Sequence, residues 1–233
     1  MNKSLMLIIL ISSVLFVQGC TLDEKGNSRE ENKMASLNQQ LLSAAEAKDT
    51  EGLVKLLQEG ADVQAQDQSG RTALMIATYN HDAASAQKLI EAGADVNLQD
   101  NMLNSPFLYA GAEGYLDILR MTIQAGADPS ITNRYGGTAL IPASEHGYVD
   151  VVQELLTNTS VDVNHVNKLG WTALLEAIIL NDGNERQQKT IELLISHGAD
   201  VNLADGDGVS PLSHAKNKGF KEIEEILVGA GAR

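Results

Sequence analysis

Gly60-Ala61-Asp62-Val63 is the first of six related phrases that run along the chain. The later copies are Gly93-Ala94-Asp95-Val96, Gly126-Ala127-Asp128-Pro129, the degraded Ser160-Val161-Asp162-Val163, Gly198-Ala199-Asp200-Val201 and the final Gly231-Ala232-Arg233. The first three copies are spaced by 33 residues. A period of this length is typical of a solenoid, in which one small structural unit is stacked repeatedly on itself.

A second phrase keeps step with the first. Its copies are Thr72-Ala73-Leu74, Ser105-Pro106-Phe107, Thr138-Ala139-Leu140, Thr172-Ala173-Leu174 and Ser210-Pro211-Leu212. Each Thr or Ser hydroxyl can accept a hydrogen bond from the first turn of a helix, and Pro is tolerated at the next position. The Gly of the first phrase follows apolar runs and can close a helix in the left-handed conformation. Each unit is therefore predicted to contain a capped helix, a turn, a second helix and an extended link.

Together these phrases resemble the ankyrin repeat, whose pattern is Gly-x-Thr-Pro-Leu-His-x-Ala followed by Gly-Ala-Asp-Val-Asn. The resemblance covers residues 34–233 and implies an all-α solenoid of about six stacked helix-turn-helix repeats with short hairpin turns. The predicted repeats are 35–66, 67–99, 100–132, 133–166, 167–204 and 205–233. The first and last repeats have the polar character of solenoid caps, so we expect a monomer.

The first residues indicate export. Lys3 precedes an apolar stretch, Leu5–Val17, that is too short to span a bilayer and is typical of a signal peptide. Val17-Gln18-Gly19-Cys20 resembles the cleavage box of bacterial lipoproteins, which implies a signal peptide at 1–19 and lipidation of Cys20. The alternative is an ordinary secretory signal with an incidental cysteine. Thr21, which is not Asp, implies by the same resemblance an outer-membrane anchor facing the periplasm.

Cys20 is the only cysteine, so the chain cannot form an internal disulfide and its stability must come from packing. Residues 21–33 are charged and almost free of apolar side chains. We expect residues 20–33 to be the lipidated cysteine and a flexible, solvated tether with a reach of about 20 Å.

The formal net charge is −14, and removal of residues 1–19 changes it to −15 because Lys3 is lost. Such acidity disfavours nucleic acid as a ligand, and it disfavours contact with anionic membranes except through the lipid anchor. It is compatible with a protein partner that has a basic surface, or with solubility alone.

The sequence offers no candidate for catalysis, a metal or a cofactor. The five histidines fall at different repeat positions and no pair has metal-ligand spacing. Asp205-Gly206-Asp207-Gly208 begins like a calcium loop, but Lys216 stands where a bidentate Glu is required, so we interpret it as a turn between repeats. We expect a protein that is not an enzyme.

The ankyrin resemblance implies a binding surface made by the hairpin turns and the first helices on the concave face. The candidate partner-binding residues at these places are Arg71, Tyr79, Met102, Glu113, Arg134, Tyr135, Glu145, His146, Trp171 and Glu176. Met102 and Leu103 would expose apolar area unless a partner or a neighbouring turn covers them. Arg134, Tyr135 and Trp171 are expected to lie side by side, either as a contact cluster or as packing between hairpins.

Glu176 stands among aliphatic residues of a first helix, so its carboxylate must face the groove or find a donor such as His146 or a backbone N–H. With Glu113 and Glu145 it could form an acidic strip for a Lys or Arg of a partner; the alternative is that the other two carboxylates are simply solvated. Pro142 is expected to remove a hydrogen bond from its helix or to kink it, either shaping the groove or being merely tolerated.

The fifth repeat is stretched, because Asp162 and Asp200 are 38 residues apart. The additional residues fall in 181–188, a polar turn between the two helices. This turn either contacts a partner or has no role in binding. The sequence as a whole predicts a non-catalytic protein-binding module on the bacterial envelope. By resemblance it is either an inhibitor or immunity-type protein, or a scaffold for a resident periplasmic enzyme such as a catalase.

Overall fold

The computed structural model describes residues 24–233, with side chains described from residue 30. The predicted signal peptide and Cys20 lie outside this part. Twelve α-helices make up the described residues, and their β-structure is limited to a single bridge between Gln66 and Thr72. The helices are α1 (Glu24–Glu46), α2 (Thr50–Gln58), α3 (Ala73–Tyr79), α4 (Ala83–Glu91), α5 (Pro106–Glu113), α6 (Leu116–Gln124), α7 (Leu140–Glu145), α8 (Val149–Asn158), α9 (Ala173–Ile179), α10 (Glu185–Ser196), α11 (Pro211–Lys218) and α12 (Lys221–Gly229).

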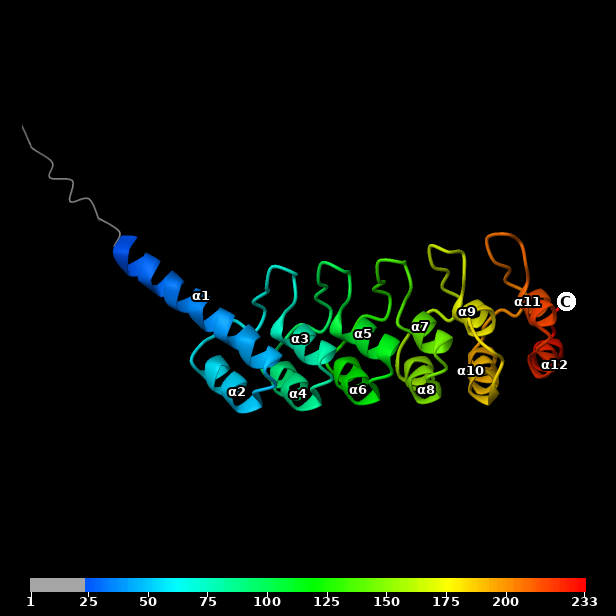
Figure 1. Cartoon of the computed structure of the whole chain (residues 1–233), viewed down its shortest axis with the longest axis horizontal. Coiled ribbons are helices and arrows are strands. Elements are labelled where there is room, and N and C mark those ends of the chain that lie inside the picture. Colours follow the sequence, from blue (N-terminus) through cyan, green and yellow to red (C-terminus); the bar gives the residue numbers. More distant parts are fainter. Residues whose placement is uncertain (1–23) are drawn as a thin grey trace, which may run out of the picture.

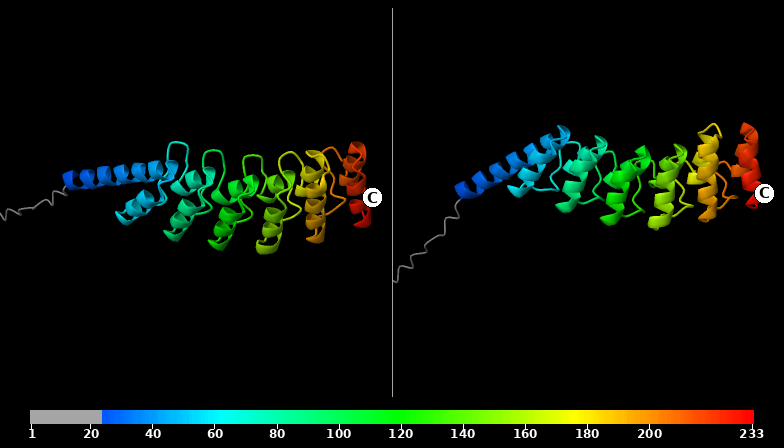
Figure 2. Two further views of the ribbon diagram at one scale, coloured as in Figure 1. Left: turned by 60° about the horizontal axis from the view of Figure 1, so that its bottom comes forward. Right: turned by 90° about the horizontal axis from the view of Figure 1, so that it is seen from below.

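The helices form two rows. Figure 1 shows α3, α5, α7, α9 and α11 in one row, the even-numbered helices in a second row beneath them, and the hairpin loops projecting together from one side of the stack. The two turned views in Figure 2 show the same sequential stacking of helix pairs. The predicted all-α solenoid of helix-turn-helix repeats is therefore confirmed.

Local hydrogen bonds begin the first helices where the Thr/Ser phrase predicted. The side chains of Thr72, Ser105, Thr172 and Ser210 each accept a hydrogen bond from the backbone N–H three residues later. The glycines of the Gly-Ala-Asp phrase adopt positive φ after the second helices, for example Gly60 at +96°. Both ends of the helical pairs are thus set by side chains and conformations that the sequence itself specifies.

The fourth repeat departs from this pattern because of Pro142. Proline has no N–H to give to the carbonyl of Thr138, which instead accepts from Ile141 at 3.2 Å. Helix α7 consequently begins at Leu140 and lacks a side-chain cap, and the buried Thr138 Oγ1 has no hydrogen-bond partner. The prediction that Pro142 removes a helix hydrogen bond is confirmed.

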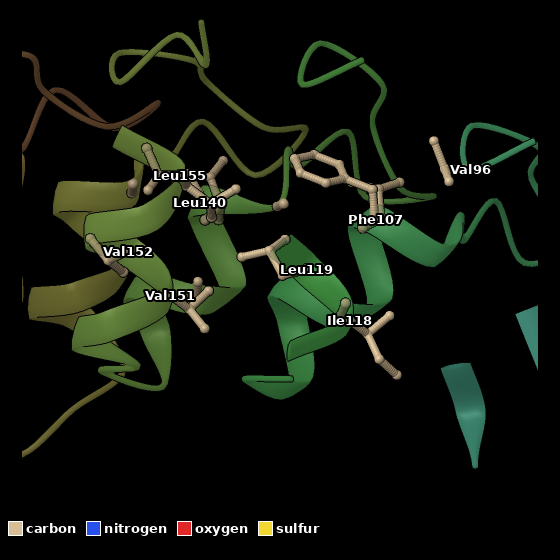
Figure 3. Packing of buried hydrophobic residues seen from close by; sticks show 14 of the residues in the cluster. Val96, Phe107, Ile118, Leu119, Leu140, Val151, Val152 and Leu155 are labelled. Carbon is tan, nitrogen blue, oxygen red and sulfur yellow. The ribbon is translucent and has the colours of Figure 1, made fainter. Parts of the chain in front are cut away.

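A continuous apolar core runs through the stack between the two rows of helices. Figure 3 shows Phe107, Leu119, Leu140 and Leu155 converging where successive repeats meet, and all four are fully buried. Burial of each side chain of this size contributes about 1.5–3 kcal/mol to folding. Each repeat buries its apolar faces against its neighbours, so the stability of the solenoid depends on the contact between repeats.

The first helix corrects the prediction of a flexible tether. Residues 24–33, expected to be coil, form the beginning of α1, which extends past the first repeat in Figure 1. Leu37 and Leu41, farther along the same helix, are buried in the core. Because a packed helix is extended at little cost by residues such as Glu, Lys and Arg, its polar N-terminal part continues the helix into solvent.

The insertion of the fifth repeat is divided between a loop and a longer helix. Helix α9 ends at Ile179 and α10 begins at Glu185 with 12 residues, where α8 has 10. The side-chain amides of Asn181 and Gln187 donate to the carbonyl of Glu145 at 2.7 and 2.8 Å. The inserted residues thereby join the fourth and fifth repeats.

None of the helices in the described residues has the length and apolar character to cross a bilayer.

Candidate functional site

Each hairpin turns around one Asp or Asn side chain. The Oδ1 atom accepts hydrogen bonds from the backbone N–H groups two and four residues later, at 2.8–3.1 Å. These residues are Asp67, Asp100, Asn133, Asn167 and Asp205. Because Oδ1 is used in the turn, the second polar atom of each side chain is available to the first helix or to a neighbouring repeat.

In the second and third repeats, that second atom binds two of the predicted contact residues. Arg71 donates to Asp67 Oδ2 at 2.7 Å and to Glu46 at 2.9 Å. The Tyr79 hydroxyl donates to Asp100 Oδ2 at 2.5 Å, and burial together with this carboxylate raises the pKa of Tyr79 to about 12. Arg71 and Tyr79 therefore hold repeats together.

In the fifth and sixth repeats the second atom faces the first helix. His214 Nε2 lies 2.7 Å from Asp205 Oδ2, and the imidazole is the donor because a carboxylate only accepts. At the same places one repeat earlier, Asn167 Nδ2 donates to Glu176 Oε1, also at 2.7 Å. The hydrogen-bond donor to the Glu176 carboxylate is thus Asn167. The prediction that His146 or a backbone N–H would be this donor is wrong.

In the fourth repeat the second polar atom of the hairpin side chain, Nδ2 of Asn133, has no partner on the first helix. Asn133 corresponds to Asn167, but Pro142 stands where Glu176 stands in the next repeat and offers no hydrogen-bonding group. The Nδ2 group of Asn133 makes no hydrogen bond within the described residues. Gly137, at the place of Trp171, also contributes no side chain. These three residues leave a gap in the surface.

A pocket of about 300 Å³ opens at this gap, between the hairpins and first helices of the fourth and fifth repeats. Its lining residues are Asn133, Tyr135, Gly137, Ile141, Pro142, Glu145, Asn167, Leu169, Glu176 and Leu180. Three predicted contact residues, Tyr135, Glu145 and Glu176, come together here. Sequence reasoning missed Asn133, Leu169 and Leu180. Alignment of the hairpin phrases would have found Leu169, which follows Tyr135 by 34 residues.

Two acidic side chains give the pocket its electrostatic character. Glu176 is only 6% exposed, and neither Glu176 nor Glu145 forms an ion pair within the described residues. Burial, and secondarily the charge of Glu145, raise the pKa of Glu176 to about 7, while the hydrogen bond from Asn167 opposes this rise. The pocket therefore contains a carboxyl group that would ionise readily if a cation approached it.

Apolar side chains stand at the hairpin tips beside the pocket. Met102, Tyr135 and Leu169 occupy the same hairpin position in three successive repeats and are 47%, 55% and 57% exposed. We call these three residues the tip row. The Arg134 guanidinium lies 4.8 Å from the centre of the Tyr135 ring, and its Nη1 lies 3.8 Å from Met102 Sδ. The neighbouring tips leave about half of each side chain uncovered.

Trp171 is on the hairpin next to that of Arg134 and Tyr135, as expected: the N–H of Lys168 donates to the carbonyl of Tyr135 at 2.9 Å. The Trp171 side chain is not part of the tip row. It is half-buried, does not line the pocket, and has no ring contact with Tyr135 among the described residues. Trp171 is aligned with Arg71, two positions beyond the tip, so it projects from a different part of the hairpin.

Glu113 and His146 also lie outside the pocket. Glu113 is exposed near Tyr109, whose pKa is raised by burial and by this carboxylate. His146 is exposed, with its ring 5.4 Å from that of Tyr148. The predicted acidic strip is thus reduced to Glu145 and Glu176. Among the side chains described, those of residues 30–233, no group of three or more His, Cys, Asp or Glu is arranged to hold a metal ion.

Comparison with known proteins agrees with the geometry. A model of the family described as "Ankyrin repeats (3 copies)" matches residues 41–133 and 107–205, which together are more than half of the chain. The chain belongs to the ankyrin-repeat family. Ankyrin repeats are a non-enzymatic fold and generally serve as protein–protein interaction modules.

Ankyrin proteins of known structure share nearly the whole repeat region. An ankyrin repeat domain from Acinetobacter baumannii AYE is 53% identical, with a TM-score of 0.81 over 83% of this chain and 98% of that domain. The ankyrin repeat protein EF0377 is 41% identical, with a TM-score of 0.80 over 82% of this chain and 97% of the other.

A sequence relative covers a smaller part of the chain. The ankyrin repeat protein YahD of Escherichia coli (strain K12) is 51% identical over 81 residues, which are 35% of this chain and 40% of YahD.

Proposed function

We propose that this ankyrin-repeat protein is a non-catalytic binding module whose protein partner rests on the tip row and on the pocket between the fourth and fifth repeats. The observation that carries the proposal is the tip row itself: Met102, Tyr135 and Leu169 are aligned, adjacent and about half exposed. Exposed apolar groups gathered beside a concave, partly polar pocket are a feature of interaction sites.

Chemistry and geometry support this surface over others on the molecule. Tyrosine and arginine are enriched among the residues that dominate binding energy, and Arg134 with Tyr135 places both beside the pocket. Arg71 and Tyr79, by contrast, have their polar groups occupied by bonds between repeats. The surface available to a partner is therefore centred on repeats three to five.

The proposed location is the periplasmic face of the outer membrane. Val17-Gln18-Gly19-Cys20 and Thr21 support an acyl anchor at this place. The part of α1 that precedes Leu37 would hold the first repeat about 20 Å from the anchor end of the helix, given a rise of about 1.5 Å per residue. A partner could then reach the tip row without obstruction by the bilayer.

Within this location we propose an inhibitor or immunity-type role, in which the protein blocks an enzyme that reaches the envelope. The acidic pocket supports a partner with a basic surface. A scaffold for a resident periplasmic enzyme, such as a catalase, would use the same surface, so the two roles are separated by the identity of the partner and by the effect of binding on its activity.

Capture of the partner tests the proposal. The lipidated protein is expressed at its native level in its own host, crosslinked and purified, and a captured envelope protein is then reconstituted from pure components. We expect a one-to-one complex that is lost in a Tyr135→Ala, Leu169→Ala variant. A matched variant, Met34→Ala with Val228→Ala, removes two exposed apolar side chains far from the pocket and should retain the complex.

The effect on the partner decides between the two roles. Loss of the partner's activity on binding supports inhibition, and a gain supports a scaffold. Equal capture by the Tyr135→Ala, Leu169→Ala variant and the wild type would refute the proposed surface.

A further inference from the structure

The pocket contains a charge that nothing in the described protein balances. Glu145 and Glu176 both line it, and no Lys or Arg side chain of residues 30–233 pairs with either. Glu154 on α8, by contrast, accepts a hydrogen bond from Arg120 at 2.7 Å. A nearly buried carboxyl without a cation is a costly arrangement that a positively charged ligand would relieve.

One oxygen of Glu176 is free to bind such a ligand. Oε1 accepts from Asn167 Nδ2, whereas Oε2 has no hydrogen-bond partner and is not among the enclosed unsatisfied atoms. Since Glu176 lines the pocket, its accessible oxygen faces that space. A donor entering the pocket can therefore reach Glu176 without breaking the bond to Asn167.

The walls of the pocket suit an alkyl chain that ends in a cation. Ile141, Pro142, Leu169 and Leu180 supply apolar surface, and the carboxyls supply acceptors. The volume of about 300 Å³ is at the lower limit of pockets for small molecules, which span about 300–1,000 Å³, and is suited to one side chain. Arginine and lysine are the side chains that combine an apolar stem with a charged end.

We propose that the pocket between the fourth and fifth repeats receives an arginine side chain of the protein partner. Its guanidinium would bridge Glu145 and Glu176, and its stem would lie against Pro142 and Leu169. A planar guanidinium can bind two carboxylates at once and can also stack on an aromatic ring, as the guanidinium of Arg134 does on the ring of its neighbour Tyr135. An ammonium group, by contrast, is a point charge.

Asn133 adds a hydrogen-bond donor to a pocket whose carboxylates are acceptors. Its Oδ1 accepts from the N–H groups of Tyr135 and Gly137, which directs its Nδ2 donor away from the turn, and Asn133 lines the pocket. This donor is complementary to a backbone carbonyl next to the inserted arginine. The pocket thus offers acceptors for the side chain and a donor for the main chain of one partner residue. The inference rests on the proposed protein-binding function and specifies what the site recognises.

The test uses n-butylguanidinium, a probe with the stem and charge of an arginine side chain. It is titrated into the purified ¹³C,¹⁵N-labelled full chain and followed by the carboxyl and side-chain amide NMR signals. We expect millimolar binding, with changes concentrated at Asn133, Glu145 and Glu176. Glu176→Gln should weaken binding about tenfold, because it replaces a charge-assisted hydrogen bond by a neutral one. Glu225→Gln, an exposed carboxylate on α12, should leave the affinity unchanged.

Two further probes define what would overturn the proposal. Uncharged n-butanol should bind at least several-fold more weakly; equal binding of n-butanol, or equal binding to Glu176→Gln, would refute a cation site. Equal affinity for n-butylammonium would refute the preference for arginine. If n-butylguanidinium does not bind while partner capture still depends on Tyr135 and Leu169, the arginine pocket is wrong and the proposed function stands. If the probe binds and capture is insensitive to those residues, the proposed surface fails instead.

Discussion

Asn167 donates to Glu176 at 2.7 Å across the junction of hairpin and helix in the fifth repeat. Asp205 and His214 make the corresponding bond in the sixth repeat, with the donor and acceptor exchanged between hairpin and helix. Both pairs are nine residues apart, so the repeat geometry is preserved while its chemistry is inverted. The inversion places a carboxyl group at a position where the sixth repeat has an imidazole, and it thereby produces the acidic pocket.

The exchange predicts that Asn167→Asp is destabilising and that Glu176→His rescues it. The single change sets two carboxyl groups against each other, while the second recreates the Asp–His pair of the sixth repeat. We expect a loss of about 2 kcal/mol for Asn167→Asp at pH 8, and a favourable coupling of about 1–3 kcal/mol in the double variant. Urea denaturation of all four proteins measures the coupling. Additive effects of the two changes would show that the pairs are not equivalent.

Stability should fall with rising pH because of Glu176. Its pKa is about 7 in the folded protein, above the ordinary value of 4.5, so the folded state binds the proton more tightly than the unfolded state does. The folded state is therefore favoured most below pH 4.5 and loses this advantage as the pH rises through 7. Glu176→Gln removes the ionisation and retains an acceptor for Asn167.

We expect Glu176→Gln to be close to the wild type at pH 5 and more stable by about 1–2 kcal/mol at pH 8.5. Urea denaturation at the two pH values provides the measurement, and Glu225→Gln serves as the exposed control. A stability difference between the Gln variant and the wild type that is the same at both pH values would contradict the raised pKa of Glu176.

Pro142→Ala should stabilise the fourth repeat. The change restores an N–H donor for the carbonyl of Thr138 and allows the Thr138 hydroxyl to cap the helix as Thr72 and Thr172 do. The gain is expected to be about 1–2 kcal/mol, after allowing for the greater freedom of Ala in the unfolded chain. Pro106→Ala is the matched control, because Pro106 occupies the first turn of α5 where no donor is needed. Thermal unfolding should therefore show a gain for Pro142→Ala alone.

Leu103→Gly should also stabilise the protein. Leu103 has φ of +60°, in the left-handed region, at a hairpin position where the other repeats have Gly70, Gly136, Gly170 and Gly208. Relief of this conformation is expected to contribute about 1 kcal/mol, since a side chain at positive φ is strained and Gly is not. Leu169→Gly, at an exposed site without positive φ, should be neutral or destabilising. If Leu103→Gly lowers the melting temperature, contacts of the Leu103 side chain outweigh the strain.

The sequence alone determined the repeat, the places where most of the first helices begin, and most of the capping. These features depend on short-range requirements: a hydroxyl three residues before an N–H, as at Thr72, and a glycine where φ is positive, as at Gly60. Such requirements are met within a few residues, so they can be read from the order of residue types. The effect of Pro142 was predictable for the same reason.

Only the tertiary structure decided where the pocket lies and which candidates meet in it. The pocket exists because Pro142 and Gly137 of one repeat leave unfilled the space beside Glu176 and Leu169 of the next, and no single repeat specifies that space. Trp171, on the hairpin next to Tyr135, does not line the pocket. Residues 24–33 became helical because Leu37 and Leu41 are packed farther along the same helix. In each case the outcome depends on packing between segments that are distant in sequence, whose free energy a local pattern does not contain.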